Sequence, residues 1–228
     1  MKIIKTLLLS SVIAASSAYA SEDSTDILLK IRGVSAFVDT KQSGLPSATS
    51  TRGIASPRNP GKIFENGLGG ELSATMFFKN NIAAEVGSGL TVYRTKSSST
   101  QAIEHNYSTK TQSAKAKDLF AVPTYLTIQY HIAPYGGFRP YVGAGYHYTY
   151  IHPKSNIYKF DHGSGLVVQA GLDLVFMDDS YLNFDFKQYM LESKVKYSTA
   201  FVNNNGKAIA GKLKMNPMVV GVGFGFKL

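Results

Sequence analysis

The feature that most constrains this chain is an alternation of apolar side chains with polar or small ones at a period of two residues. The clearest case covers 165–177, where every even position from Leu166 to Phe176 is apolar. The same period recurs at 180–191 and at 217–228. A helix would repeat its apolar positions about every 3.6 residues, so this pattern predicts β-strands with one apolar face.

The alternating segments and the connections between them predict a closed barrel. Eight segments can be traced, at 27–38, 67–78, 81–93, 119–132, 139–151, 165–177, 180–191 and 217–228. The connections are in turn long and short: the long ones are 39–66, 94–118, 152–164 and 192–216, and the short ones are 79–80, 133–138 and 178–179. An even number of strands joined in this way predicts an all-β, eight-stranded antiparallel up-and-down barrel with its long loops at one end.

The N-terminus predicts export from the cytoplasm. Lys2 and Lys5 precede the apolar run 6–15, and Ala18-Tyr19-Ala20 follows it as a cleavage site for signal peptidase. The run is too short to act as a permanent membrane anchor, which needs about 20 residues. We therefore expect a signal peptide at 1–20 and one barrel domain at 21–228. The chain has no cysteine, which is compatible with an oxidising periplasm.

The composition of the polar stripe distinguishes a membrane barrel from a soluble, lipocalin-like one. A stripe exposed to water would carry many Lys and Glu, whereas this one is rich in glycine: Gly69, Gly87, Gly89, Gly143, Gly145, Gly221, Gly223 and Gly225. Small residues suit the crowded interior of an eight-stranded barrel. The apolar stripe should therefore face lipid, in the outer membrane of a Gram-negative bacterium, with the short turns in the periplasm and the long loops outside.

The same inward stripe holds candidate functional residues of two kinds. Its charges should pair as a lumen network: Lys30, Arg32, Glu71, Glu85, Asp173, Asp185 and Lys187, together with Lys227. Apolar and aromatic residues outside this network are the candidates for contact with a transported solute: Phe77, Tyr93, Tyr125, Tyr141, Val167, Val175 and Tyr189. Aromatic residues near segment ends are expected in interfacial girdles: Phe78, Tyr93, Tyr130, Tyr148, Tyr150 and Tyr181.

Several stretches in order resemble the outer membrane protein W (OmpW) family over most of the mature chain. They are 138–145 (Phe-Arg-Pro-Tyr-Val-Gly-Ala-Gly), 80–85, 122–124 with 129–130, 169–173 and 216–217. The resemblance implies a monomeric barrel with a narrow, largely apolar channel for small hydrophobic molecules, which can leave sideways into the membrane. Two features depart from the family. The chain has no tryptophan, so the family's gating residues do not carry over, and it ends in Leu228 where the insertion machinery usually meets Phe.

The distribution of charge along the chain indicates which partners the protein is expected to contact. The four long loops hold 16 Lys and Arg against 6 Asp and Glu. A basic rim of this kind fits the phosphates of lipopolysaccharide, although a plain solvated loop surface explains it equally well. Nucleic acid is not expected as a partner because it conflicts with export. A second hypothesis is a surface protein without transport: an adhesin, a phage or bacteriocin receptor, or a structural barrel. A continuous apolar lumen would favour transport, and a plugged one would favour this alternative.

Neither catalysis nor metal binding has a convincing signature, and we expect no enzyme and no cofactor. Asp161, His162 and Ser164 lie too close in one loop to orient a base toward a nucleophile, and Gly-x-Ser-x-Gly is absent. His147 and His152 with His162 could share a metal, but their spacing matches no familiar site. Asp178-Asp179 is interpreted as a turn.

Overall fold

The structure is a computed structural model of the chain. It describes the residues in ten segments: 27–38, 40–43, 65–79, 81–94, 118–132, 137–153, 158–160, 162–177, 179–197 and 210–228. The predicted signal peptide at 1–20 lies outside them, as do most of the predicted loops 39–66 and 94–118.

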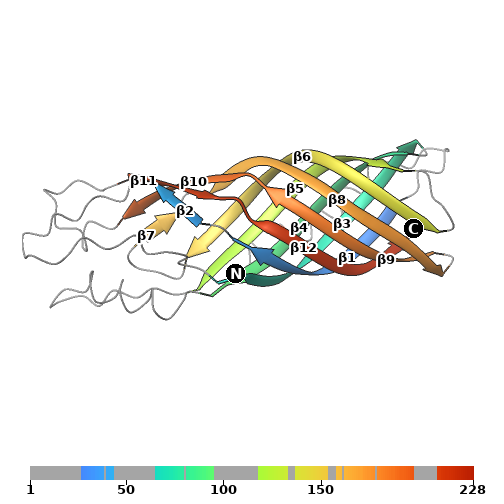
Figure 1. The fold of residues 1–228 in the computed structure, drawn as a ribbon, viewed down its shortest axis with the longest axis horizontal. Coiled ribbons are helices and arrows are strands. Elements are labelled where there is room, and N and C mark those ends of the chain that lie inside the picture. The colour runs from blue at the N-terminus through green and yellow to red at the C-terminus, as the bar shows by residue number, and fades with distance from the viewer. Residues whose placement is uncertain are drawn as a thin grey trace, which may run out of the picture.

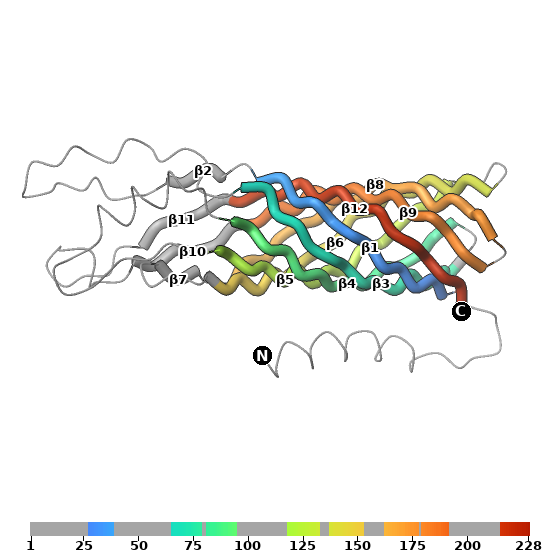
Figure 2. The backbone as a smooth tube through the Cα atoms, turned by 90° about the horizontal axis from the view of Figure 1, so that it is seen from below, coloured from blue at the N-terminus to red at the C-terminus, as the bar shows by residue number. Residues whose placement is uncertain are grey.

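Eight strands form a closed antiparallel barrel. Each strand is inclined to the long axis of the barrel, as two perpendicular views show (Figure 1 and Figure 2). The strands are β1 (Ile27–Phe37), β3 (Gly67–Lys79), β4 (Ile82–Tyr93), β5 (Leu119–His131), β6 (Phe138–Pro153), β8 (Gly163–Met177), β9 (Ser180–Tyr189) and β12 (Met218–Lys227). Each pairs with the next, and β1 closes the ring against β12 from Leu28↔Lys227 to Phe37↔Met218. The predicted eight-stranded up-and-down barrel is confirmed.

Short strands continue the sheet beyond the barrel at its long-loop end. They are β2 (Thr40–Ser43), β7 (Tyr158–Phe160), β10 (Leu191–Tyr197) and β11 (Ala210–Met215). β10 pairs with β11 and with β7, and β11 pairs with β2. The prediction that 192–216 is one loop is therefore wrong at both of its ends. Backbone pairing needs no apolar stripe where a strand leaves the membrane, so alternation could not reveal these extensions.

The two faces of the barrel wall have the opposite polarity to a soluble barrel. Along β1, Lys30 and Arg32 are buried while Ile31 between them is 54% exposed. The outer face carries large exposed apolar side chains on every barrel strand, among them Leu72, Leu90, Leu126, Val142, Leu166, Phe184 and Phe224. An apolar exterior around a polar interior is the distribution of an outer-membrane barrel. None of the described residues belongs to a helix long and apolar enough to cross a membrane.

Residue parity, that is, whether a position is odd or even along its strand, corrects two of the expected girdle positions. Phe78, Tyr130, Tyr148 and Tyr150 are exposed on the outer face. Tyr93 and Tyr181, in contrast, are buried inside the lumen, at 3% and 4% exposure. Both are odd-numbered residues on strands whose odd positions point inward, so their nearness to a strand end does not place them outside.

Lys227 also departs from the expected arrangement. The alternation placed it among the lumen charges, but its side chain is exposed at the end of β12. On this strand the odd positions are buried only as far as Gly225, and Lys227, the last residue of β12, lies at the rim of the barrel. The lumen network therefore contains the other seven predicted charges without Lys227.

Candidate functional site

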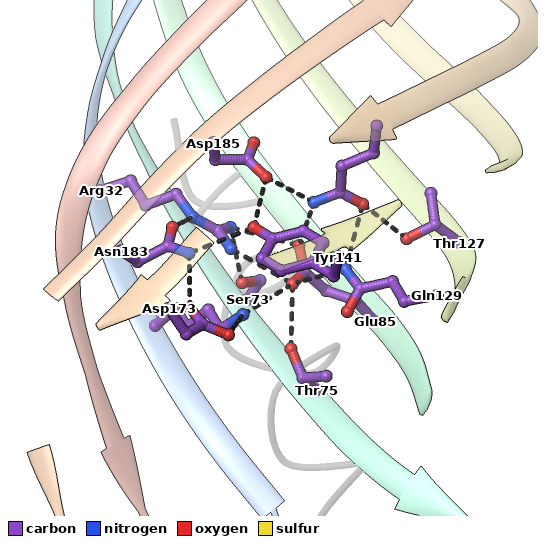
Figure 3. A network of polar contacts seen from close by, with 12 residues as sticks. Arg32, Ser73, Thr75, Glu85, Thr127, Gln129, Tyr141, Asp173, Asn183 and Asp185 are labelled. Carbon is purple, nitrogen blue, oxygen red and sulfur yellow. Dashed lines mark hydrogen bonds and ion pairs between the residues drawn. The ribbon is translucent and has the colours of Figure 1, made fainter. Parts of the chain in front are cut away.

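The seven predicted lumen charges meet at mid-height in the barrel. They come from five strands: Lys30 and Arg32 from β1, Glu71 from β3, Glu85 from β4, Asp173 from β8, and Asp185 and Lys187 from β9. All seven are at most 4% exposed. Figure 3 shows most of these side chains pointing toward one another across the lumen. A buried charge is stable only when it is paired. The partners of each residue therefore determine the chemistry of these seven residues, which together form the charge layer.

Arg32 is the centre of the network. Its Nη1 donates to Glu71 Oε1 at 2.7 Å and to Ser73 Oγ at 2.8 Å. Its Nη1 and Nη2 lie 3.2 Å from the two carboxylate oxygens of Glu85, which is the bidentate geometry that guanidinium groups favour. Its Nε donates to Asn183 Oδ1. One guanidinium thus ties together strands β1, β3, β4 and β9.

The two lysines complete the ion pairs. Lys30 Nζ lies 3.0 Å from Asp173 Oδ2 and 3.6 Å from Glu85 Oε2. Lys187 Nζ lies 2.8 Å from Glu71 Oε1 and also contacts the Asp185 carboxylate. Each of the three cations therefore contacts two carboxylate groups, and each of the four carboxylates contacts at least one cation.

Neutral polar side chains make the hydrogen bonds that the ion pairs leave unmade. The Tyr125 hydroxyl donates to Glu71 or Glu85, at 2.9 and 2.8 Å, and the Tyr141 hydroxyl donates to Asp185 at 2.7 Å. Sequence reasoning did not single out the others, which are Ser73, Thr75, Thr127, Gln129, Gln169 and Asn183. All six lie on the inward parity beside a predicted charge, and that position was the available signal.

Two glycines make room for the network tyrosines. A Cβ on Gly87 would collide with the ring and hydroxyl of Tyr125, and one on Gly171 would collide with the ring and hydroxyl of Tyr141. Each glycine faces the aromatic ring on an adjacent strand. The glycine-rich inward stripe therefore allows large side chains to cross a narrow lumen.

We expect Gly87→Ala to lower the free energy of unfolding by about 1–3 kcal/mol, because the added methyl group displaces Tyr125 from its carboxylate partners. Urea unfolding in phospholipid vesicles measures this. Gly33→Ala is the control, because its Cβ would meet only Val222 O at 3.9 Å. Equal effects for the two variants would contradict the argument.

Above the charges, toward the long loops, the lumen is apolar. Thirteen buried residues form one cluster there: Val34, Ala36, Val38, Tyr93, Leu119, Ala121, Tyr125, Ile151, Val167, Tyr189, Leu191, Met215 and Val219. A pocket of about 20 Å³ lies among them, also lined by Thr91, Pro123, Thr149 and Pro217. This volume is close to that of one small molecule the size of water, so a larger solute requires side chains to move.

Below the charges, toward the short turns, the lumen is aromatic and partly polar. The His131 ring lies between Phe77 and Tyr141, at centroid distances of 4.7 and 5.0 Å. Arg139 lies over the Tyr181 ring. The seven transport candidates divide among three layers: Tyr93, Val167 and Tyr189 above the network, Tyr125 and Tyr141 within it, and Phe77 and Val175 below. The expectation that all seven lie outside the network is therefore wrong for Tyr125 and Tyr141, because their hydroxyl groups reach its carboxylates.

The ladder between β4 and β5 is interrupted beside the apolar pocket, although both strands continue in the same register. The ladder between β4 and β5 is regular from Ile82↔Tyr130 to Ser88↔Thr124 and resumes at Thr91↔Ala121. The two described positions between them, Gly89 and Leu90 on β4, have no ladder partner on β5. Pro123 lies opposite and has no N–H to donate. Ser88 Oγ lies 3.3 Å from the Pro123 carbonyl oxygen, which partly replaces the missing ladder bonds.

The three histidines considered as a metal site do not converge. His147 is buried in the lumen, where it contacts Thr149 Oγ1 and the Met190 carbonyl. His152 and His162 are exposed on the outer face, where both lie near the Tyr150 ring. Among the described segments, no group of three or more potential metal ligands is found.

The profile of the OmpW family matches residues 24–228. The chain belongs to the OmpW family. A Rickettsia bellii protein is 40% identical over 208 residues, covering 91% of this chain and 82% of the relative. A Rickettsia typhi protein is 39% identical over 212 residues, covering 92% and 85%. The names of both assign them, provisionally, to the outer membrane.

Solved structures agree with the family at the level of the fold. The crystal structure of the outer membrane protein OprG from Pseudomonas aeruginosa superposes with a TM-score of 0.68 at 17% identity, covering 91% of this chain and 98% of OprG. The outer membrane protein AlkL, determined by solid-state NMR in lipid bilayers, gives a TM-score of 0.59 at 15% identity, covering 93% and 94%. The solved structures thus show the same barrel fold, and the family match with the relatives assigns the chain to the outer-membrane β-barrels.

Proposed function

We propose that this OmpW-family barrel is a narrow channel for small hydrophobic molecules, which enter from the long-loop end and leave sideways into the membrane. The observation that carries the proposal is the position of the interruption in the β4–β5 ladder. The apolar pocket lies above a paired charge layer, and Pro123, at the interruption, is one of its lining residues. The pocket therefore adjoins a part of the wall that fewer ladder hydrogen bonds hold together, and strands are easier to separate there.

The charge layer argues against passage along the whole barrel axis. Crossing it would require a solute to separate buried ion pairs whose members have no access to water. A hydrophobic molecule offers these groups no replacement partner. A side exit avoids this cost, because the solute passes from an apolar lumen into the apolar bilayer.

Uptake of an apolar dye into vesicles that contain the refolded mature chain tests the proposal. We expect faster dye entry than into empty vesicles, and no faster entry of a small ion. Val167→Trp should reduce dye entry to the level of empty vesicles, because Val167 is fully buried in the apolar layer and a larger side chain there fills the route.

Phe77→Trp is the matched control, because Phe77 lies below the charge layer and off the proposed route. It should leave dye entry within about two-fold of the wild type. Loss of entry in the control as well would indicate an axial path and contradict the side exit. Entry no faster than into empty vesicles would overturn the channel.

The second candidate is a surface protein without transport, acting as an adhesin, a receptor for phage or bacteriocin, or a structural barrel. One observation favours it: the paired charge layer plugs the lumen between the outside and the periplasm. Absence of dye entry together with normal folding would favour this candidate over the channel.

We also propose the surroundings in which this function operates. The barrel acts as a monomer, since its eight strands close on themselves and need no second copy. Its basic loops contact lipopolysaccharide phosphates, and the insertion machinery of the outer membrane assembles it after signal-peptide cleavage. No step of the proposed transport requires catalysis, a cofactor or nucleic acid.

A further inference from the structure

One residue that lines the proposed solute pocket has a buried hydroxyl group without a partner among the described residues. Tyr189 lines the pocket and is only 2% exposed. Its Oη is buried and makes no hydrogen bond to any residue that the structure describes. A polar atom that is removed from water without a partner is unfavourable and uncommon in folded proteins. The position therefore points to a group that is absent from the chain itself.

The surroundings hold the Tyr189 ring in place. The ring lies edge-on to His147 at a centroid distance of 5.0 Å and to Tyr125 at 6.5 Å. The His147 imidazole contacts the Met190 carbonyl, and the Tyr125 hydroxyl is occupied by Glu71 and Glu85. Neither neighbouring ring makes a hydrogen bond to the Tyr189 hydroxyl, although both lie close enough to pack against the ring.

Apart from Thr91 and Thr149, the rest of the pocket is suited to a hydrocarbon chain. Leu119, Ile151, Leu191, Met215 and Val219 are all buried along its walls. A molecule placed there would bury a hydrocarbon body among them, and this burial supplies most of its affinity. The unpartnered hydroxyl would add one directed hydrogen bond.

The charge layer disfavours an anionic solute, and the apolar walls of the pocket disfavour a charge of either sign. Three buried cations, Lys30, Arg32 and Lys187, face four carboxylates, and each cation already contacts two of them. In the network as the structure describes it, no cation is left over for an incoming carboxylate. An anionic solute would meet a layer with one excess negative charge.

We infer that the solutes this barrel accepts are neutral apolar molecules that carry one oxygen function, such as a ketone or an alcohol, and that the Tyr189 hydroxyl binds this oxygen. The phenol can donate to a carbonyl oxygen or accept from a hydroxyl, so both fit. The inference rests on the proposed channel, and it names the class of solute for the same pocket.

Methyl NMR of the refolded mature chain in nanodiscs tests the inference, with n-decane and decan-2-one as the probes. Ile151 reports on the pocket, and Ile128, which is 55% exposed on the outer face, reports on partition into lipid. Both solutes should shift the Ile151 signal of the wild type. In Tyr189→Phe the affinity for decan-2-one relative to decane should fall roughly five-fold, the effect of one hydrogen bond.

The possible outcomes separate the inference from the channel. An unchanged affinity ratio in Tyr189→Phe, with both solutes still shifting Ile151, would overturn the role of the hydroxyl and leave the channel standing. Shifts at Ile128 without any at Ile151 in the wild type would overturn the channel itself. Decanoate that binds as tightly as decan-2-one would overturn the restriction to neutral solutes. Urea unfolding should show Tyr189→Phe to be as stable as the wild type, since no hydrogen bond is lost.

Discussion

Oxidation of the two thiols of a Leu90→Cys, Val122→Cys variant to a disulfide is expected to stop dye entry through the barrel, and a reductant that returns them to thiols is expected to restore it. These positions face outward and lie opposite each other where the ladder between β4 and β5 is broken. The bond would hold the two strands together without placing atoms in the lumen. The native chain has no cysteine, so no other thiol can interfere.

The same strands provide a matched control. Val86 and Leu126 form an outward-facing pair inside the regular part of the ladder, so Val86→Cys with Leu126→Cys clamps strands that are already joined. Its oxidation should change dye entry by less than about two-fold. If both clamps left dye entry unchanged, solutes would not leave between β4 and β5. If both stopped it equally, the loss would reflect general stiffening of the barrel.

Parity was the most informative signal in the sequence. It distinguished lumen from lipid face along every barrel strand, because a strand places alternate side chains on opposite faces. Tyr93 and Tyr181 were expected in a girdle from their position near strand ends, although their odd numbers placed them inside, and for Tyr93 parity had also given the lumen. Parity itself was wrong for Lys227, which is the last residue of β12 and is exposed at the rim of the barrel.

The arrangement of the lumen was less accessible than its membership. The seven charges could be selected from the alternation, but their partners depend on register, and a shift of two residues would exchange one set of contacts for another. Asn183, Gln129 and Gln169 carry no charge, so selecting the inward charges did not assign them to the network, although the alternation placed them on the inward face. The interruption of the ladder at Pro123 depends equally on register, since it matters only because it lies beside the pocket.

The division of the lumen into layers explains why the two hypotheses about function could not be separated by composition. The sequence suggested that an apolar path and a charged plug were alternatives. The structure contains both, one above the other, with Val34 and Val219 in the apolar layer and Lys187 in the plug. A side exit makes the two compatible, and the clamp at Leu90 and Val122 therefore tests the side exit directly, which the presence of a plug on the axis does not.

Arg32→Met is expected to destabilise the barrel by about 3–5 kcal/mol, because it leaves buried carboxylates without their shared partner. Glu71 and Glu85 both contact the guanidinium, and neither has access to water. Urea unfolding in phospholipid vesicles measures the change. Arg139→Met is the control, since Arg139 lies below the network and packs over Tyr181; its loss should cost about 1 kcal/mol or less.

A second substitution shows whether the loss comes from charge or from packing. Glu85→Gln in the Arg32→Met background removes one of the stranded carboxylates, so it should restore part of the lost stability, although Glu85→Gln alone should destabilise the wild type. A purely steric role for Arg32 predicts that the two losses add. Equal stability of Arg32→Met and the wild type would mean that the buried carboxylates tolerate isolation, and the plug would then not be held by its ion pairs.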